Sequence, residues 1–199
     1  MTHHAAPMRQ PGGRVPAPGR LHVVQDFINT VDIEDATDAF DSVSAVDRWL
    51  RRRDLLGGGD RLRDPDDLDR AVRLREALRE VCAANHALRA PPPAAVEIVE
   101  AAARDAVLTI ARDSHDEWRL QPRAAGLAGA LGWLVVIMYG AMVDAQWWRL
   151  KVCHNDACRW AFWDSSPNRR GRWCAMAICG NRAKVKAYRG RSSPKSAED

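Results

Sequence analysis

The spacing of apolar residues predicts a chain built mainly of helices. The clearest signal follows Asp64, which can cap a helix, and Pro65, which suits the first helical position. Apolar residues then recur every three or four positions, so that one stripe would face a core and the arginines would occupy the other side. We expect this helix to run to about Leu88, before the prolines at 91–93. The stripe consists of Leu68, Ala71, Leu74, Leu78, Val81 and Asn85.

Weaker patterns predict further elements on both sides of that helix. Ser44 and Asp47 form a capping box that predicts a helix through Leu56, and glycines at 57–59 stop it. Further along, apolar segments flank a polar stretch, which is typical of a small β-hairpin. The elements expected after the long helix are a short helix from Ala94 to Ala103 and hairpin strands at 107–111 and 117–121.

A run of twenty uncharged residues, Ala124 to Val143, admits two interpretations. It is long enough to span a bilayer. It also suits the centre of a helical domain, because a helix that is apolar all round must be buried. We favour the buried helix, since the run is single, is rich in Ala and Gly, and follows amphipathic stripes that need a partner. The predicted fold class is mainly α with a small β-hairpin, and no membrane partner is expected.

Charge divides the chain into two parts. Residues 1–148 carry a net charge of −4, whereas residues 149–199 carry 12 Lys and Arg against 4 Asp and Glu, a net charge of +8. Such an asymmetry is expected when one end of a protein meets a polyanion. The predicted organisation is a disordered Pro/Gly-rich leader (1–20), a helical domain (21–148), a small basic C-terminal module (149–191) and a disordered tail (192–199).

Four of the five cysteines lie within the basic module, as two pairs with equal spacing. Four residues separate Cys153 from Cys158 and Cys174 from Cys179, and fifteen residues lie between the pairs. Two close pairs joined by a loop are typical of a structural zinc site, in which four thiolates form a tetrahedron and leave no open position for catalysis. A [4Fe–4S] cluster and four unrelated thiols are the alternatives. We expect one structural zinc ion per chain.

The compartment and the neighbouring residues support this interpretation. The segment before Arg20 lacks the apolar stretch of a signal peptide, so we expect a cytoplasmic protein, in which paired cysteines bind metal more often than they form disulfides. His154 adjoins Cys153 and is expected to be a solvated neighbour of the site, not a ligand. Cys82 lies on the apolar stripe of the long helix and is expected to be a core residue.

The same segment resembles a known family. The similarity is to the CGNR zinc finger, named for Cys179-Gly180-Asn181-Arg182, and it extends over RLKVCHNDACRWAFWDSSPNRRGRWCAMAICGNRAKVKAYRGR. Upstream, Asp26-Phe27-x-Asn29-Thr30 looks like the signature of the ABATE domain, which commonly precedes this finger. The resemblance implies a mainly helical N-terminal domain, zinc-held turns followed by a helix, and a bacterial transcription regulator. Many relatives have Gly where this chain has Arg159, and we expect that residue to distort the first cysteine turn slightly.

Basic side chains of the finger are candidates for contacts with DNA. If Asn181 caps a short helix, Arg182, Lys186 and Arg189 fall on one of its faces. A metal-held unit with a basic helix and a basic loop can neutralise phosphates and enter the major groove. A solvated surface is the alternative, but a net charge of +8 exceeds what solubility needs. The candidate DNA contacts are Arg169, Arg170, Arg172, Arg182, Lys184, Lys186 and Arg189, while Val185 and Tyr188 are expected nearer the packing side of the helix.

The helical domain shows no nucleophile motif, no glycine-rich phosphate loop and no HExxH, so we do not expect an enzyme. Asp26, Asn29 and Thr30 either line a small-molecule pocket or cap a helix start and tie down an N-terminal strand, and we favour the second interpretation. The predicted function is a zinc-dependent, DNA-binding transcription regulator whose N-terminal domain senses a small-molecule effector or forms a homodimer. The alternative is a zinc-stapled adaptor that binds protein or RNA without enzymatic activity.

Overall fold

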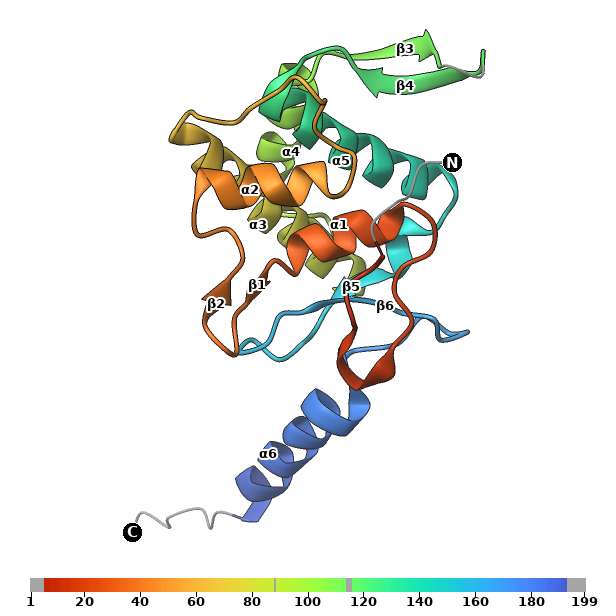
Figure 1. Ribbon diagram of the computed structural model, residues 1–199. Helices are drawn as coiled ribbons and strands as arrows, with labels where there is room; N and C mark the ends of the chain where they lie inside the picture. The colour runs from red at the N-terminus through yellow and green to blue at the C-terminus, as the bar shows by residue number, and fades with distance from the viewer. Residues whose placement is uncertain (1–5, 88, 114–115, 193–199) are drawn as a thin grey trace.

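The computed structural model describes residues 6–87, 89–113 and 116–192, and it shows a helical body from which one basic helix projects (Figure 1). The prediction of a mainly α protein with a small β-hairpin is confirmed. The body helices are α1 (Leu21–Ile28), α2 (Val43–Arg51), α3 (Asp66–Ala87), α4 (Pro93–Asp105) and α5 (Gly126–Val143), and the projecting helix is α6 (Asn181–Ser192). The strands pair as antiparallel hairpins: β1 (Val31–Asp32) with β2 (Thr37–Asp38), β3 (Leu108–Arg112) with β4 (Trp118–Pro122), and β5 (Leu150–Val152) with β6 (Ala161–Trp163).

The long helix α3 lies at the centre of the body. Its start is fixed by Asp64, whose Oδ1 accepts a hydrogen bond of 3.0 Å from the backbone N–H of Asp66. Leu74, Leu78 and Cys82 are buried, and α1, α2, α4 and β5 pack against the helix. The predicted apolar stripe is thus confirmed, and Leu88, the predicted end of this helix, lies outside the described residues.

The prediction that the arginines of α3 face away from the core is wrong for two of them. Arg75 and Arg79 are buried, and both pair with Glu76, at 2.8 and 2.9 Å. The guanidinium of Arg79 also donates to the carbonyls of Ile28, at 2.6 Å, and Arg159, at 2.8 Å. Burial of a charge is tolerated where hydrogen bonds and an ion pair replace its hydration. Arg79 therefore links α3 to α1 and to the C-terminal module.

The start of α2 also differs from the prediction. Ser42, not Ser44, caps the helix: its Oγ accepts a hydrogen bond of 3.2 Å from the N–H of Ala45. Ser42 has the extended backbone of an N-cap, whereas Ser44 already lies within the helix. The helix ends at Arg51 rather than Leu56, and Asp47 binds the side chain of Arg51 at 2.8 Å.

Helix α5 is long and apolar enough to cross a membrane by length and composition, and it is the one such helix among the described residues. In the structure 56% of this segment is buried, against α1, α4 and β4. Gly132 allows the close approach, because a Cβ at that position would lie 2.3 Å from the Cβ of Ala106. The structure therefore uses α5 as a core helix.

The N-terminal segment is not the disordered leader that its composition predicts. Among its described residues, the guanidinium of Arg14 donates to the carbonyls of Trp163, at 3.2 Å, and Trp173, at 2.9 Å. Gln10 and Ala17 are buried, and Gly12 has a φ of 65°. Low hydrophobicity misleads here because hydrogen bonds to the rest of the fold, together with the burial of Ala17 in the core, hold the segment. Residues 1–5 and 193–199, which include most of the predicted tail, lie outside the described residues.

Candidate metal centre and basic surface

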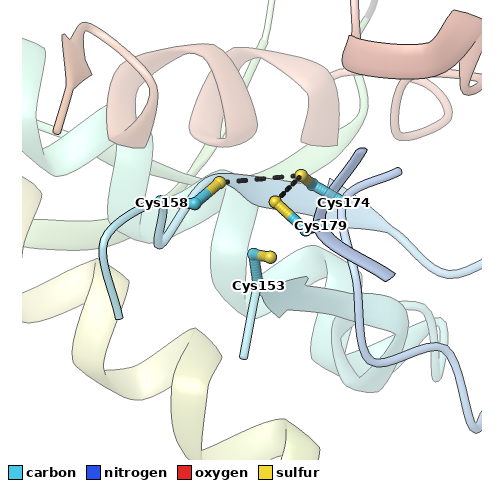
Figure 2. Close-up of side chains that lie close together, drawn as sticks. All are labelled: Cys153, Cys158, Cys174 and Cys179. Carbon is cyan, nitrogen blue, oxygen red and sulfur yellow. Dashed lines mark hydrogen bonds between the residues drawn. The ribbon is translucent and has the colours of Figure 1, made fainter. Parts of the chain in front are cut away.

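The predicted cysteine ligands come together from separate segments of the finger. Cys153 follows β5, Cys158 precedes β6, Cys174 ends the loop after β6, and Cys179 lies in the helical turn that leads into α6 (Figure 2). Their four Sγ atoms all lie within 4.8 Å of one another, and all four residues are buried. None of them forms a disulfide.

The spacing of the sulfur atoms fits a tetrahedral zinc ion. The Sγ atom of Cys174 lies 3.6 Å from that of Cys158 and 3.7 Å from that of Cys179 (Figure 2). Sulfurs about 2.3 Å from a tetrahedral zinc lie about 3.8 Å from one another, whereas disulfide sulfurs are about 2.05 Å apart. Soft thiolates suit zinc. The four cysteines form a single zinc site of the structural kind, with every ligand position filled by protein.

The thiols of this cluster cannot all ionise on their own. Hydrogen bonds from Cys158 and Cys174 lower the pKa of the Cys153 thiol. In turn, the hydrogen bond to Cys153 raises the pKa of Cys158, and hydrogen bonds with both neighbours raise the pKa of Cys174. The protein thus stabilises one thiolate at the expense of its neighbours. A dication at the centre would supply the charge that four thiolates need.

The first cysteine turn places Arg159 in a backbone conformation that favours glycine. The φ angle of Arg159 is 47°, in the left-handed region that favours glycine. The turn is nevertheless closed, because the N–H groups of Cys158 and Arg159 both donate to the carbonyl of Asn155, at 2.8 and 2.9 Å. The guanidinium of Arg159 binds Glu80 of α3 at 2.7 Å, a contact that a glycine would lack.

An ion pair buried beneath the loop between the cysteine pairs organises that loop. Lys151 Nζ donates to Asp164 Oδ2 at 2.9 Å, and both side chains are buried. Asp164 also accepts from the hydroxyl of Ser166, at 2.6 Å, and from the N–H of Gly171, at 2.8 Å. Burial raises the pKa of the Asp164 carboxyl, but these hydrogen bonds more than offset it and lower the pKa to about 2. Sequence reasoning did not single out Lys151, because its partner Asp164 lies thirteen residues further along the chain.

Asp26, Asn29 and Thr30 lie on or just after helix α1, not on a strand, and they do not line the three main clefts found among the described residues. All three are buried. Asn29 exchanges two hydrogen bonds with the backbone of Ala161 in β6, and Asp26 accepts two from the N–H of Met8. Asp26 and Asn29 thus tie α1 to the N-terminal segment and to the finger, while the hydroxyl of Thr30 accepts from Arg75 of α3 at 3.3 Å. That these residues line a ligand pocket stays a prediction.

Helix α6 begins differently from the prediction. Asn181 is not its N-cap, because the chain is already helical from Met176 and the backbone of Asn181 is itself helical. The Asn181 side chain instead donates to the carbonyl of Ala177 at 3.2 Å. Val185 and Tyr188, which we expected nearer the packing side of this helix, are 49% and 67% exposed. Helix α6 stands away from the body (Figure 1).

The candidate DNA contacts are all exposed, but they fall into two groups. Arg169, Arg170 and Arg172 lie on the loop between the cysteine pairs, where Arg169 has a φ of 54°. The second group lies on α6 and consists of Arg182, Lys184, Lys186 and Arg189. Within it, Arg182 forms an ion pair with Glu34, in the turn between β1 and β2.

His154 is exposed, as expected for a residue beside the metal ligands, but it is not simply solvated. Its ring packs edge-on against the ring of His86 at the end of α3, with a centroid separation of 3.9 Å. It also contacts Trp173 and lies 3.4 Å from the guanidinium of Arg172. His86 was missed by sequence reasoning, because its partner lies far away in the chain.

A four-cysteine metal centre held against a helical domain defines a zinc-finger protein. Residues 149–192 match the family model of the CGNR zinc finger, and residues 21–145 match that of the ABATE domain, described as "Putative stress-induced transcription regulator". The chain belongs to the ABATE family and carries a CGNR zinc finger. Both resemblances seen in the sequence are confirmed. The chain matches none of the curated proteins.

Proposed function

We propose that this protein regulates transcription by binding DNA through its zinc-held finger. The observation that carries the proposal is the placement of α6. This helix stands away from the body (Figure 1), and Lys184 and Lys186 are exposed on it without a carboxylate partner among the described residues. An exposed basic helix has the width to enter the major groove, where lysines can bind phosphates and base edges.

The loop arginines extend this basic surface, while Arg182 plays a different part. Because Arg182 pairs with Glu34 of the body, we assign it the role of fixing the direction of α6. Lys184 and Lys186 then make the principal DNA contacts. Zinc serves as a scaffold and performs no chemistry, and the regulator has no enzymatic activity and acts in the cytoplasm. The helical body would sense an effector or form a homodimer.

The test is DNA binding by the full-length, zinc-loaded protein, measured by fluorescence anisotropy with labelled duplex DNA at low salt. Replacing both α6 lysines (Lys184→Ala with Lys186→Ala) should lower the affinity about tenfold or more, because each lysine contributes a phosphate contact. The salt dependence of binding should become shallower for the same reason. The matched control is Arg63→Ala with Arg104→Ala, which removes two exposed cations from the body. Equal affinities for these two double variants would contradict the proposed role of α6.

A second candidate function has one observation in its favour. The finger exposes several apolar side chains beside its cations: Met176, Ile178, Val185 and Tyr188. Exposed apolar groups of this kind are typical of protein interfaces. They favour a zinc-stapled adaptor that binds a protein partner or single-stranded RNA. A competition gel with duplex DNA, single-stranded RNA and no nucleic acid separates these outcomes.

A further inference from the structure

A cleft of about 650 Å³ lies between the end of α3 and the finger. One wall comes from the body, through His86 of α3, and another from Trp148, in the short turn before β5. The finger supplies the third wall, through His154 and the loop that carries Arg170. Volumes of this order are typical of sites for small molecules. The cleft is thus large enough for a ligand that contacts the body and the finger together.

The charge of this cleft is one-sided. No carboxylate lines it, and the one lysine in its wall, Lys151, is already paired with Asp164. Arg169, Arg170 and Arg172 are among the residues that line the cleft, and none of the three has a carboxylate partner within the described part of the chain. The guanidinium of Arg172 lies over the ring of Trp173, 5.7 Å from its centroid. Three arginines without carboxylate partners around one cleft favour an anion, and the planar donors of a guanidinium match the oxygens of a phosphate.

The remaining groups of the cleft favour a ligand with an aromatic ring. The side chain of Trp148 is 46% exposed although it lines the cleft, so its ring is available for stacking. On the body side, the buried Nε2 of His86 makes no hydrogen bond within the described residues. A buried polar atom without a partner is costly, and a bound molecule can supply one.

We propose that this cleft binds a small phosphorylated aromatic compound of the nucleotide class. The arginines hold the phosphate and Trp148 stacks on the ring. The same phosphate chemistry could come from the DNA backbone, but the cleft has a wall from the body as well as one from the finger. A small ligand can use both walls. Its binding would bridge α3 and the loop between the cysteine pairs, so that the ligand acts on the finger directly. This proposal goes beyond DNA binding and does not depend on it.

Isothermal titration calorimetry of the full-length, zinc-loaded protein tests the proposal with three probes: adenosine diphosphate, pyrophosphate and adenosine. Adenosine diphosphate should bind most tightly, at one molecule per chain. Arg170→Glu should weaken the binding of adenosine diphosphate and pyrophosphate about tenfold or more. Trp148→Ala should weaken the binding of adenosine diphosphate and leave that of pyrophosphate unchanged. Arg63→Ala, which removes an exposed arginine elsewhere on the body, is the control and should alter neither.

Two results would overturn this proposal. One is the absence of saturable binding by adenosine diphosphate and pyrophosphate to protein that contains zinc and is folded. The other is loss of DNA binding in Arg170→Glu with no binding of either small probe, which would show that the cleft accepts DNA phosphates alone. Nucleotide binding that persists in the variant lacking both α6 lysines, together with loss of DNA binding, supports both proposals separately. Nucleotide binding without any DNA binding would refute only the DNA-binding function.

Discussion

Asn29, the residue after α1, and Ala161 of β6 exchange two hydrogen bonds of 2.8 Å. The side-chain amide of Asn29 donates to the carbonyl of Ala161 and its oxygen accepts from the N–H of the same residue. Ala161 is three residues beyond the metal ligand Cys158, and both partners are buried. One side chain of the body thus pairs with the strand of the finger as a neighbouring strand would. The body and the zinc finger are joined by this pair rather than by a linker alone.

Asn29→Ala is expected to destabilise the protein by about 1–3 kcal/mol, because it leaves the buried N–H of Ala161 without a partner and its carbonyl with only the bond of 3.2 Å from the amide of Gln25. Urea unfolding of the zinc-loaded protein gives this value. Asn181→Ala serves as the control, since the amide of Asn181 makes one exposed hydrogen bond on α6. The control should change the stability by no more than about 0.5 kcal/mol. Equal effects of the two substitutions would contradict the assigned role of Asn29.

Arg14→Ala is expected to loosen the N-terminal segment from the finger. The substitution removes two hydrogen bonds to finger carbonyls and the stacking of the guanidinium over Phe162, 4.6 Å from the ring centroid. The cost should be about 1–3 kcal/mol. Amide hydrogen exchange should become faster in the segment around Phe162, while Arg9→Ala, at an exposed position in the same segment, leaves it unchanged. Unchanged exchange in Arg14→Ala would mean that the segment does not brace the finger.

Asp164→Asn is expected to destabilise the protein by about 3 kcal/mol near neutral pH, because Lys151 is left charged and buried without a carboxylate. The folded pKa of Asp164, about 2, lies below the value of about 3.9 for an unfolded aspartate. Its contribution to stability is therefore complete above about pH 4 and is lost as the pH falls towards 2. The difference in unfolding free energy between the variant and the natural chain should shrink over that range. Acid removes zinc from both proteins, so the difference between their unfolding free energies is the quantity to measure. A difference that stays constant from pH 6 to pH 2 would refute the role of the pair formed by Lys151 and Asp164.

Cys174→Ser is expected to abolish stoichiometric zinc binding and to lower the melting temperature by about 10 °C, because the finger and the body share hydrogen bonds. Elemental analysis should give one zinc per chain before the substitution. Cys82→Ala is the matched control: Cys82 is buried in the core, where burial raises the pKa of its thiol, and it lies outside the cluster. This control should lose stability but keep its zinc. Loss of zinc from both variants would argue against the four-cysteine site.

The elements that could be predicted from the sequence are those whose signals are local. The apolar stripe of α3, the β3–β4 hairpin and the paired cysteines each depend on spacing within a short segment, and each is found in the structure. The failures share a different cause. Carbonyls that lie far away in the chain hold Arg79, Asn29 and the segment around Arg14. A sequence pattern does not reveal which distant carbonyls the fold will bring close to a side chain. The two histidines that meet at 3.9 Å were missed for the same reason.

The salt dependence of DNA binding by the zinc-loaded protein tests the central claim most directly. Anisotropy titrations with duplex DNA at several salt concentrations give a slope of log affinity against log salt. We expect the slope to change by about −0.9 for each phosphate contact. When Lys184 and Lys186 are both replaced by alanine, the slope should be shallower by the amount that two phosphate contacts contribute. Binding should be lost after zinc is removed. DNA binding that is absent from the zinc-loaded protein, or that is independent of salt, would contradict the account.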